Sequence, residues 1–277
     1  SNAAVVIADS VNLSADVTID TTSGNANVTL LGGAPGGPAE GIYASTAGLT
    51  LTIDAGTGTA FIGGDEASGN LAGFGNNSGT ASLIGSIDIT AGDTRLYGTS
   101  NEFEFDWYIN GPLTLANPNN VAISISGGGG FIMNGTVDSA VNTTNSLTLG
   151  TGGAYKLQGA VGSTVPLARL ATQGNVQLFL SDNVTTTGNQ TYGSAQAVQL
   201  AGDVTLTGNT ASFTGGLNGA TNDLVLNFSG LTTIDGASTF ANIGDLTSTG
   251  PTALNGTVQT IGNQTYSGNV SLIGATT

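Results

Sequence analysis

The sequence predicts an all-β protein built as a parallel β-helix, and three observations lead to this prediction. Gly accounts for 45 of 277 residues, whereas charged residues make up 8%, about a third of their usual share. Short apolar–polar–apolar units such as Leu-Thr-Leu and Val-Gln-Leu recur between Gly, Asn and Asp, as expected for short strands joined by turns. Finally, the stretch Gly188–Tyr192 returns as Gly262–Tyr266, 74 positions later, and such duplication is typical of repeat architectures.

The alternative all-β architecture is a sandwich of hairpins, whose strands commonly run about five to six residues. The units in this chain are shorter, and a β-helix coil of about 18 to 25 residues would fit three or four times into the 74-residue repeat. In a β-helix, equivalent residues stack about 4.8 Å apart. Stacked Thr and Asn can form hydrogen bonds, whereas stacked charges of one sign repel each other. The low charge therefore favours the β-helix.

Most predicted strands alternate Val, Ile, Leu or Phe with a polar residue, and they end near Gly, Asn or Asp. No apolar stripe at helical spacing is sustained anywhere, so we expect no helix. Residues 31–40 and 63–79 are rich in Gly and lack alternation, which predicts loops that project from one side of the solenoid and could bind a partner. In chain order, the predicted strands are residues 5–7, 17–19, 28–30, 49–53, 61–62, 82–84, 87–89, 101–110, 113–115, 121–125, 131–133, 147–149, 176–178, 198–200, 204–206, 224–226 and 270–272.

The domain organisation follows from the same pattern. Residues 1–3 read Ser-Asn-Ala, which looks like a cloning scar and is left out of the fold prediction. Residues 4–277 contain no linker, so we expect a single solenoid that is less regular over 4–110 and has regular repeats over 147–277. If the repeat holds a whole number of coils, Tyr192 and Tyr266 lie on the same side of the rod.

Charge and composition exclude several classes of function. The net charge is −15 and Lys and Arg together number 3, so the chain lacks the cations that nucleic acid or an anionic membrane surface would require. There is no His and no Cys, which removes Ser-His-Asp and Cys-His catalysis and most transition-metal sites. No run of about 20 apolar residues is present, so no membrane insertion as a helix is expected. The sequence therefore predicts no catalytic residue and no cofactor.

The stretch 101–110 differs from the rest because three carboxylates alternate with aromatic residues. On one strand, alternation would place Glu102, Glu104 and Asp106 together on one face. The simplest interpretation is an ordinary amphipathic strand. Two functional interpretations stay open: a Ca²⁺ site formed with carbonyl oxygens, and an acid/base pair for glycoside hydrolysis.

The aromatic residues of this stretch also allow two interpretations. Trp107 and Tyr108 could form a platform on which a sugar stacks, or they could cap the core at an irregular coil. Gly127–Gly130 lacks the Lys-Ser/Thr pair of a phosphate-binding loop, which predicts a turn.

Three stretches resemble the repeats of filamentous-haemagglutinin-like bacterial exoproteins: 184–192 (VTTTGNQTY), 246–256 (LTSTGPTALNG) and 49–58 (LTLTIDAGTG). The resemblance implies a right-handed parallel β-helix, exported by a partner outer-membrane transporter. It implies no catalytic residues. Nothing resembles the secretion-domain motifs of that family, so an internal piece of a longer chain is expected.

From these observations we expect a structural and adhesive module, located outside the cell or on a bacterial surface. It would bind glycans or proteins of host or neighbouring cells by multivalent, non-catalytic contacts. One alternative is a carbohydrate-active β-helix enzyme, or a carbohydrate-binding module, centred on residues 102–106. A further alternative is ice binding by a Thr face, since Thr-x-Thr occurs at Thr50/Thr52 and Thr205/Thr207, although at irregular spacing.

Overall fold

The computed structural model describes residues 3–32, 41–64, 74, 83–98, 100–117, 120–126, 128–140, 145–235 and 239–274. These residues form strands and connecting turns and include no helix. All strand pairings are parallel, and neighbours in each sheet are never consecutive in the chain. The chain therefore winds as a solenoid, and the predicted parallel β-helix is confirmed.

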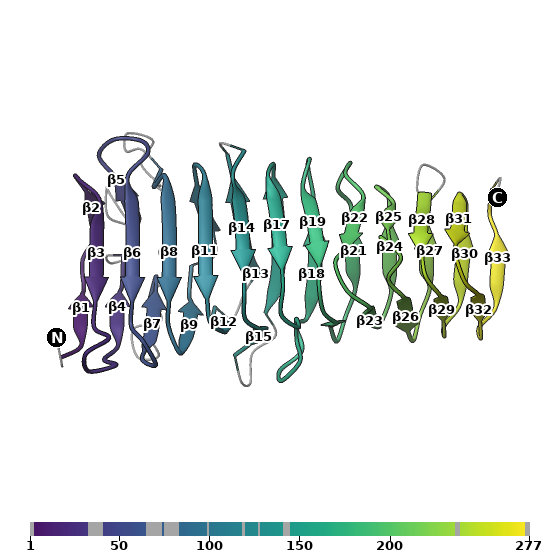
Figure 1. Cartoon of the computed structure of the whole chain (residues 1–277), viewed down its shortest axis with the longest axis horizontal. Helices are drawn as coiled ribbons and strands as arrows, with labels where there is room; N and C mark the ends of the chain where they lie inside the picture. The colour runs from purple at the N-terminus through teal and green to yellow at the C-terminus, as the bar shows by residue number, and fades with distance from the viewer. Residues whose placement is uncertain are drawn as a thin grey trace.

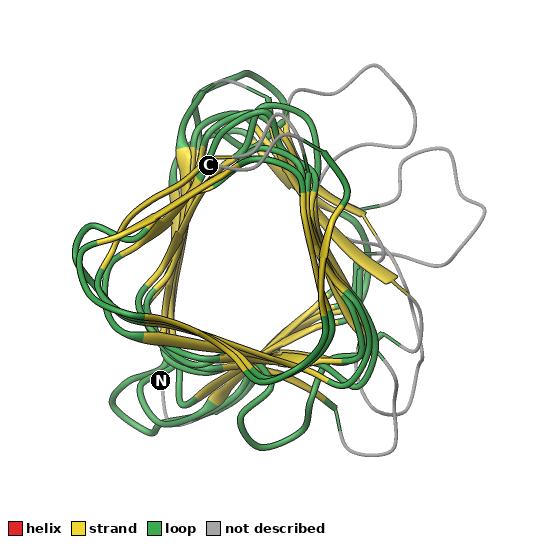
Figure 2. Ribbon diagram, turned by 90° about the vertical axis from the view of Figure 1, so that its right-hand side faces the viewer, coloured by secondary structure: helices red, strands yellow, loops and turns green. Residues whose placement is uncertain are grey.

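Most coils contribute one strand to each of three sheets, and single bridges replace a strand at Phe74 and Val161. The three sheets form the three sides of a triangular cross-section (Figure 2). Along the chain, a strand of sheet 2 is followed by one of sheet 1 and then one of sheet 3. In Figure 1 the strands of sheet 1 point downward on the near face while the chain advances from left to right. This sense of winding is right-handed.

Sheet 1 is the longest and consists of β3 (Val17–Asp20), β6 (Thr50–Asp54), β8 (Ser86–Thr90), β11 (Asp106–Asn110), β14 (Gly130–Met133), β17 (Ala154–Leu157), β19 (Gln177–Leu180), β22 (Val198–Leu200), β25 (Leu217–Asn218), β28 (Thr239–Ile243) and β31 (Thr257–Thr260). Sheet 2 consists of β10 (Ser100–Phe103), β13 (Asn120–Ile125), β16 (Ser146–Thr151), β18 (Arg169–Thr172), β21 (Gln190–Tyr192), β24 (Ala211–Phe213), β27 (Thr232–Ile234), β30 (Thr252–Leu254) and β33 (Val270–Leu272). The pair β2 (Val11–Leu13) and β5 (Ile42–Ala44) extends this side through a bridge from Ile42 to Phe74 and a hydrogen bond from the Glu102 amide to the Phe74 carbonyl.

Sheet 3 is formed in two parts joined by single bridges at Val161. Its first part consists of β1 (Val5–Ile7), β4 (Val28–Leu30), β7 (Thr59–Ile62), β9 (Asp93–Leu96), β12 (Leu113–Leu115) and β15 (Val137–Ser139). Its second part consists of β20 (Val184–Thr185), β23 (Val204–Gly208), β26 (Leu224–Phe228), β29 (Leu246–Ser248) and β32 (Gln264–Tyr266).

Coil length differs along the rod. Val17 pairs with Leu51, 34 positions later, and Leu51 pairs with Ile87, 36 positions later. Farther along, Trp107 pairs with Phe131 after 24 positions, and Phe240 pairs with Val258 after 18. The first coils are longer because they include the stretches around residues 31–40 and 63–79, most of which lie outside the described residues.

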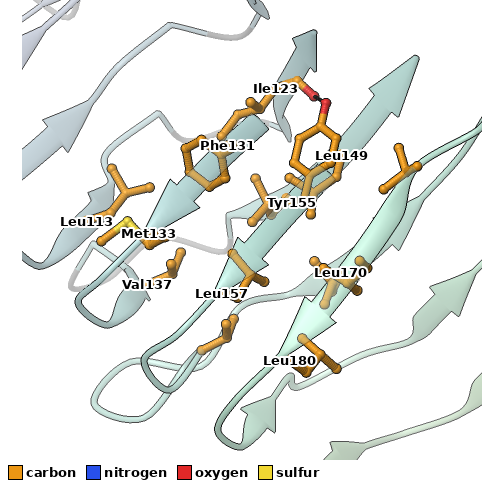
Figure 3. Close-up of a cluster of buried hydrophobic side chains, with 14 of the residues drawn as sticks. Leu113, Ile123, Phe131, Met133, Val137, Leu149, Tyr155, Leu157, Leu170 and Leu180 are labelled. Atoms are coloured by element: carbon orange, nitrogen blue, oxygen red, sulfur yellow. Dashed lines mark hydrogen bonds between the residues drawn. The ribbon is translucent and has the colours of Figure 1, made fainter. Parts of the chain in front are cut away.

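The interior is filled by the inward-pointing residues of all three sheets, as Figure 3 shows for the central coils. Aromatic rings follow one another on successive rungs: Trp107 packs on Phe131 at 5.2 Å between centroids, and Phe131 on Tyr155 at 6.1 Å. The Tyr155 hydroxyl donates to the carbonyls of Gly150 at 2.7 Å and Ile123 at 3.2 Å, so this polar group is satisfied in the core. The same residue types thus stack from coil to coil.

Asp and Asn side chains stabilise the corners, where they accept backbone N–H groups of the neighbouring coil in place of carbonyl oxygens. At the corner that leads into the second part of sheet 3, each side chain accepts a backbone N–H from the coil above. Asp203 Oδ1 accepts from Asp223 N at 2.9 Å, Asp223 Oδ1 from Asp245 N at 2.7 Å, and Asp245 Oδ1 from Asn263 N at 2.6 Å. Turn residues therefore also hold successive coils together.

The repeated Gly-Asn-Gln-Thr-Tyr stretch does not mark equivalent positions on the rod, so that prediction is wrong. Tyr192 ends β21 in sheet 2, whereas Tyr266 ends β32 in sheet 3. Gln190 pairs with Ala211, Ala211 with Thr232 and Thr232 with Thr252, which completes three coils in 62 positions. The remaining 12 positions to Gln264 cross two more corners. The 74-residue offset therefore equals three coils and two further sides.

Candidate functional site

A groove lies on the outer face of sheet 3, over β9, β12 and β15, with a volume of about 830 Å³. Alternation along each strand creates its floor. In β9, Thr94 and Leu96 point into the core, while Asp93 and Arg95 point outward. The polar residues that matter for its chemistry are Asp93, Arg95, Tyr97, Thr114, Asp138 and Thr164.

Parallel register places the outward residues of this sheet in one column. Phe61 of β7 pairs with Arg95 of β9, Arg95 with Thr114 of β12, and Thr114 with Asp138 of β15. Successive members are therefore about 4.8 Å apart along the rod axis. A cation, a hydroxyl and a carboxylate thus follow one another along the floor.

Hydrogen bonds hold the charged groups of the floor in place. Arg95 Nε donates to Asp93 Oδ2 at 2.9 Å, and Thr114 Oγ1 donates to Asp93 Oδ1, also at 2.9 Å. The guanidinium carbon of Arg95 lies 5.8 Å from the centroid of the Phe61 ring. Because the Arg95 side chain is 33% exposed and the Asp93 side chain 24%, this ion pair contributes little to stability. Its main effect is to orient Arg95.

One wall of the groove is a turn fixed by Asp138. The carboxylate Oδ1 of Asp138 accepts the backbone N–H groups of Thr164 at 2.8 Å and Val165 at 3.1 Å. The turn begins at Gly162, where φ is +69° and an added Cβ would lie 2.1 Å from the Thr185 carbonyl oxygen. Only glycine fits there without displacing the next coil.

The groove is therefore equipped for polar binding. Asp93 is engaged by Arg95 and Thr114, and Asp138 is engaged by the wall turn. Both carboxylates thus orient neighbouring groups. The groove is lined by these polar side chains together with the apolar Pro112, Ala116 and Val165, a mixed lining that suits a polar ligand with apolar faces, such as a sugar.

The structure separates the three carboxylates of residues 102–106. The predicted single strand over 101–110 is wrong, because the chain turns a corner between β10, which ends at Phe103, and β11, which begins at Asp106. Glu102 is exposed on β10, Glu104 lies in the corner with a buried Oε2 that has no hydrogen-bond partner, and Asp106 accepts the Gly130 amide at 2.8 Å. Within the described part of the chain, no group of three acidic, His or Cys residues could hold a metal ion.

Trp107 and Tyr108 do not form a shared platform. Trp107 is fully buried and packs between Phe103 and Phe131, whereas Tyr108 is 37% exposed on the outer face of β11. Adjacent strand residues point to opposite sides of a sheet, which separates the two rings. Trp107 is thus a core residue, and of the two only Tyr108 can contact a ligand.

The groove itself was not predicted from the sequence. A signal was available, since Arg95 is one of only three cations and follows Asp93 at strand spacing. However, its column partners Thr114 and Asp138 come from later coils, and their register depends on coil lengths that the sequence does not reveal. The two predicted binding loops, apart from residues 31–32, 63–64 and 74, lie outside the described residues.

Comparison of the chain with family models, with curated proteins and with solved structures finds no significant match. Within the residues that the structure describes, no helical segment has the length and apolarity needed to cross a bilayer.

Proposed function

We propose that this chain is a structural and adhesive rod segment of a large bacterial exoprotein. It acts outside the cell or on its surface, after export through an outer-membrane transporter. Its partners are glycans or proteins on host or neighbouring cells, bound without chemical conversion. The resemblance to filamentous-haemagglutinin-like repeats suggests this role, and the fold supports it.

The observation that carries the proposal is the stacking of parallel coils from one end of the described chain to the other. All three sheets follow the rod axis, and the interior consists of stacked apolar side chains (Figures 1 and 2). Each coil is fixed by pairing with its neighbours, which makes the solenoid a stiff spacer. Such a spacer holds a binding surface at a set distance from whatever anchors it.

The groove over β9, β12 and β15 supplies a binding surface on the side of this rod. Its floor offers an oriented guanidinium, a Thr hydroxyl and carboxylates, which are groups that bind the hydroxyls and carboxylates of sugars. An open site of this kind gives modest affinity, and avidity comes from many rods on one surface.

Binding to a glycan array and to whole cells tests the proposal. We expect the protein displayed on beads to bind a defined set of glycans, and Arg95→Gln to reduce this binding at least about tenfold through loss of a charge-assisted contact. Arg169→Gln is the matched control, because Arg169 is an exposed cation on sheet 2, outside the groove. Absence of binding, or equal loss in both variants, contradicts the proposal.

A second candidate is a carbohydrate-active enzyme that uses the same groove. The outward Asp93, Arg95 and Asp138 side chains favour it, because a parallel β-helix face with acidic and basic groups can bind and cleave an acidic polysaccharide. Incubation with acidic and neutral polysaccharides distinguishes the two candidates. Turnover that is lost in Asp93→Asn favours the enzyme, whereas binding without turnover favours the adhesive rod.

A further inference from the structure

A patch of large side chains lies on the outer face of sheet 1, away from the groove. The central column of this face places Asp88 of β8, Tyr108 of β11, Ile132 of β14, Lys156 of β17 and Phe179 of β19 on successive rungs. These five strands are neighbours on the near face in Figure 1. We call these five residues, together with Phe105, the sheet 1 patch.

Exposed aromatic side chains are concentrated here. Among the described residues, Phe105 at 41% and Tyr108 at 37% are the aromatic residues with the most exposed rings, and both belong to the same coil. On one side of the column, the flanking positions on the next two coils are Gly129, Gly130 and Ala154, which carry no large side chain. On the other side, Asn134 donates to Asn110. Ile132 and Phe179 of the column are half-buried, so the exposed apolar surface of the patch is centred on Phe105 and Tyr108. Neighbouring exposed apolar side chains of this kind indicate a contact surface.

A cation lies within the sheet 1 patch. The Lys156 ammonium is 5.8 Å from the centroid of the Phe179 ring, so the lysine side chain lies beside the aromatic ring. Lys156 is one of three cations in a chain with 18 acidic residues. A partner of this patch should therefore be apolar at its centre and carry a carboxylate where it meets Lys156.

The same face of a second copy has these properties. We propose that two copies of this chain associate through the sheet 1 patch, with their rods antiparallel. The two-fold axis lies between the facing sheets, parallel to the strands and midway between β11 and β14. It brings Lys156 of each copy opposite Asp88 of the other, and Tyr108 opposite Ile132.

Charge decides the orientation. In the antiparallel arrangement, Asp106 faces Gly130 of the second copy, and no two like charges of this face meet. A parallel arrangement would place Lys156 opposite Lys156 and Asp88 opposite Asp88, which is repulsive. The antiparallel dimer also forms the Lys156–Asp88 pair twice.

The size of the face sets the strength of the association. Five rungs and a strand width cover about 24 Å by about 17 Å, or roughly 400 Å² per copy. The two copies together bury about 800 Å², which is below the roughly 1,200 to 2,000 Å² of stable interfaces and in the range of weak, transient ones, so the dimer forms at high protein concentration. The self-association is independent of what the groove binds.

Sedimentation equilibrium of the whole chain with charge-reversed variants tests the arrangement. Wild type should show a reversible monomer–dimer equilibrium, and Lys156→Asp and Asp88→Lys should each weaken it at least about tenfold. An equimolar mixture of the two variants should associate as wild type does, because both opposite-charge pairs are regained in the heterodimer. Arg169→Glu, on sheet 2, is the control and should dimerise normally.

Circular dichroism of each variant confirms that it is folded. A wild-type chain that stays monomeric at its solubility limit overturns the proposal. So does a mixture of the two variants that fails to associate. Loss of glycan binding in Tyr108→Ser, with wild type monomeric, would assign the patch to a sugar and would also overturn it.

Discussion

The two Gly-Asn-Gln-Thr-Tyr stretches share a sequence and a local structure but differ in their surroundings. In the first, Tyr192 OH donates to Gln190 Oε1 at 2.7 Å, Gln190 Nε2 reaches the Val184 carbonyl at 3.4 Å, and Thr186 Oγ1 bonds to the Gly188 carbonyl at 2.9 Å.

In the second stretch the same three bonds recur. Tyr266 OH donates to Gln264 Oε1 at 3.1 Å, Gln264 Nε2 to the Val258 carbonyl at 3.1 Å, and Thr260 Oγ1 to the Gly262 carbonyl at 2.9 Å. The first stretch joins sheet 3 to sheet 2, and the second joins sheet 1 to sheet 3. The motif therefore encodes a corner that fits more than one edge of the triangle.

The two stretches differ in what covers them. Tyr192 is buried and stacks on Phe213 with 4.6 Å between ring centroids, and Gln190 also donates to the Thr207 carbonyl at 2.9 Å. Gln264 is exposed and Tyr266 only partly buried, because β32 has a neighbour on one side, β29, in sheet 3. Sequence thus specifies the local corner, while the adjacent coil supplies most of the stabilising energy.

The largest expected effect is loss of the buried tyrosine ring. Tyr192→Ala should lower the free energy of unfolding by about 3 to 5 kcal/mol through lost burial and a residual cavity. Tyr266→Ala should cost less than about 1.5 kcal/mol, since its ring is partly solvated in the folded state. Chemical denaturation followed by circular dichroism measures both, and equal losses would refute the role assigned to the adjacent coil.

The next largest effect on the free energy of unfolding is expected at the glutamine of each stretch. Gln190→Ala leaves the Thr207 carbonyl and the Tyr192 hydroxyl without their partner in the interior, so we expect a loss of about 2 kcal/mol. Gln264→Ala should cost about 0.5 kcal/mol, because water replaces the lost bonds. The same denaturation experiment applies, and a larger loss at Gln264 would reverse the comparison.

Alkaline pH should distinguish the two tyrosines further. Burial raises the pKa of Tyr192 well above its usual value near 10. Above about pH 10 the unfolded chain releases this proton while the folded chain keeps it, so stability should fall by about 1.4 kcal/mol per pH unit. Burial also raises the pKa of Tyr155 and Tyr266.

The variant Tyr192→Phe isolates the contribution of one tyrosine. It should reduce the alkaline loss of stability relative to the wild type. Denaturation midpoints of both proteins measured from pH 8 to 11 would show this, and identical slopes for the two would contradict it.

How much of this could be predicted from the sequence depends on the range of the interactions. Alternation in Leu113–Leu115, Val198–Leu200 or Val270–Leu272 is local, and those strands form as expected. The fold class followed from such units. By contrast, the corner at Glu104 and Phe105 interrupts a perfect alternation, because Gly129 of the next coil lies against the Phe105 backbone. Contacts between coils therefore determine where one strand ends and the next begins.

The candidate groove shows the same limit. Asp93 and Arg95 are two positions apart and could be associated by inspection, but Asp138 joins them only through the register of β9, β12 and β15. Trp107 and Tyr108 could have been separated by alternation alone. Register between coils depends on the length of every turn, and turn lengths here range widely.

The smallest expected effect concerns the stacked aspartates. Asp223→Asn keeps the side-chain oxygen that accepts the Asp245 amide and removes repulsion from Asp203 and Asp245, so stability should stay equal or rise by up to about 0.5 kcal/mol. Asp223→Ala should lose about 1 kcal/mol with the bond. Thermal unfolding measures both, and a stabilising alanine would show that the ladder bond contributes nothing.

Backbone hydrogen exchange is the most direct test of the claim that neighbouring coils, and not the local motif, stabilise each corner. Amides of Gln190–Tyr192, paired on both sides with β18 and β24, should exchange much more slowly than those of Gln264–Tyr266 in β32. Equal protection of the two identical sequences would contradict it.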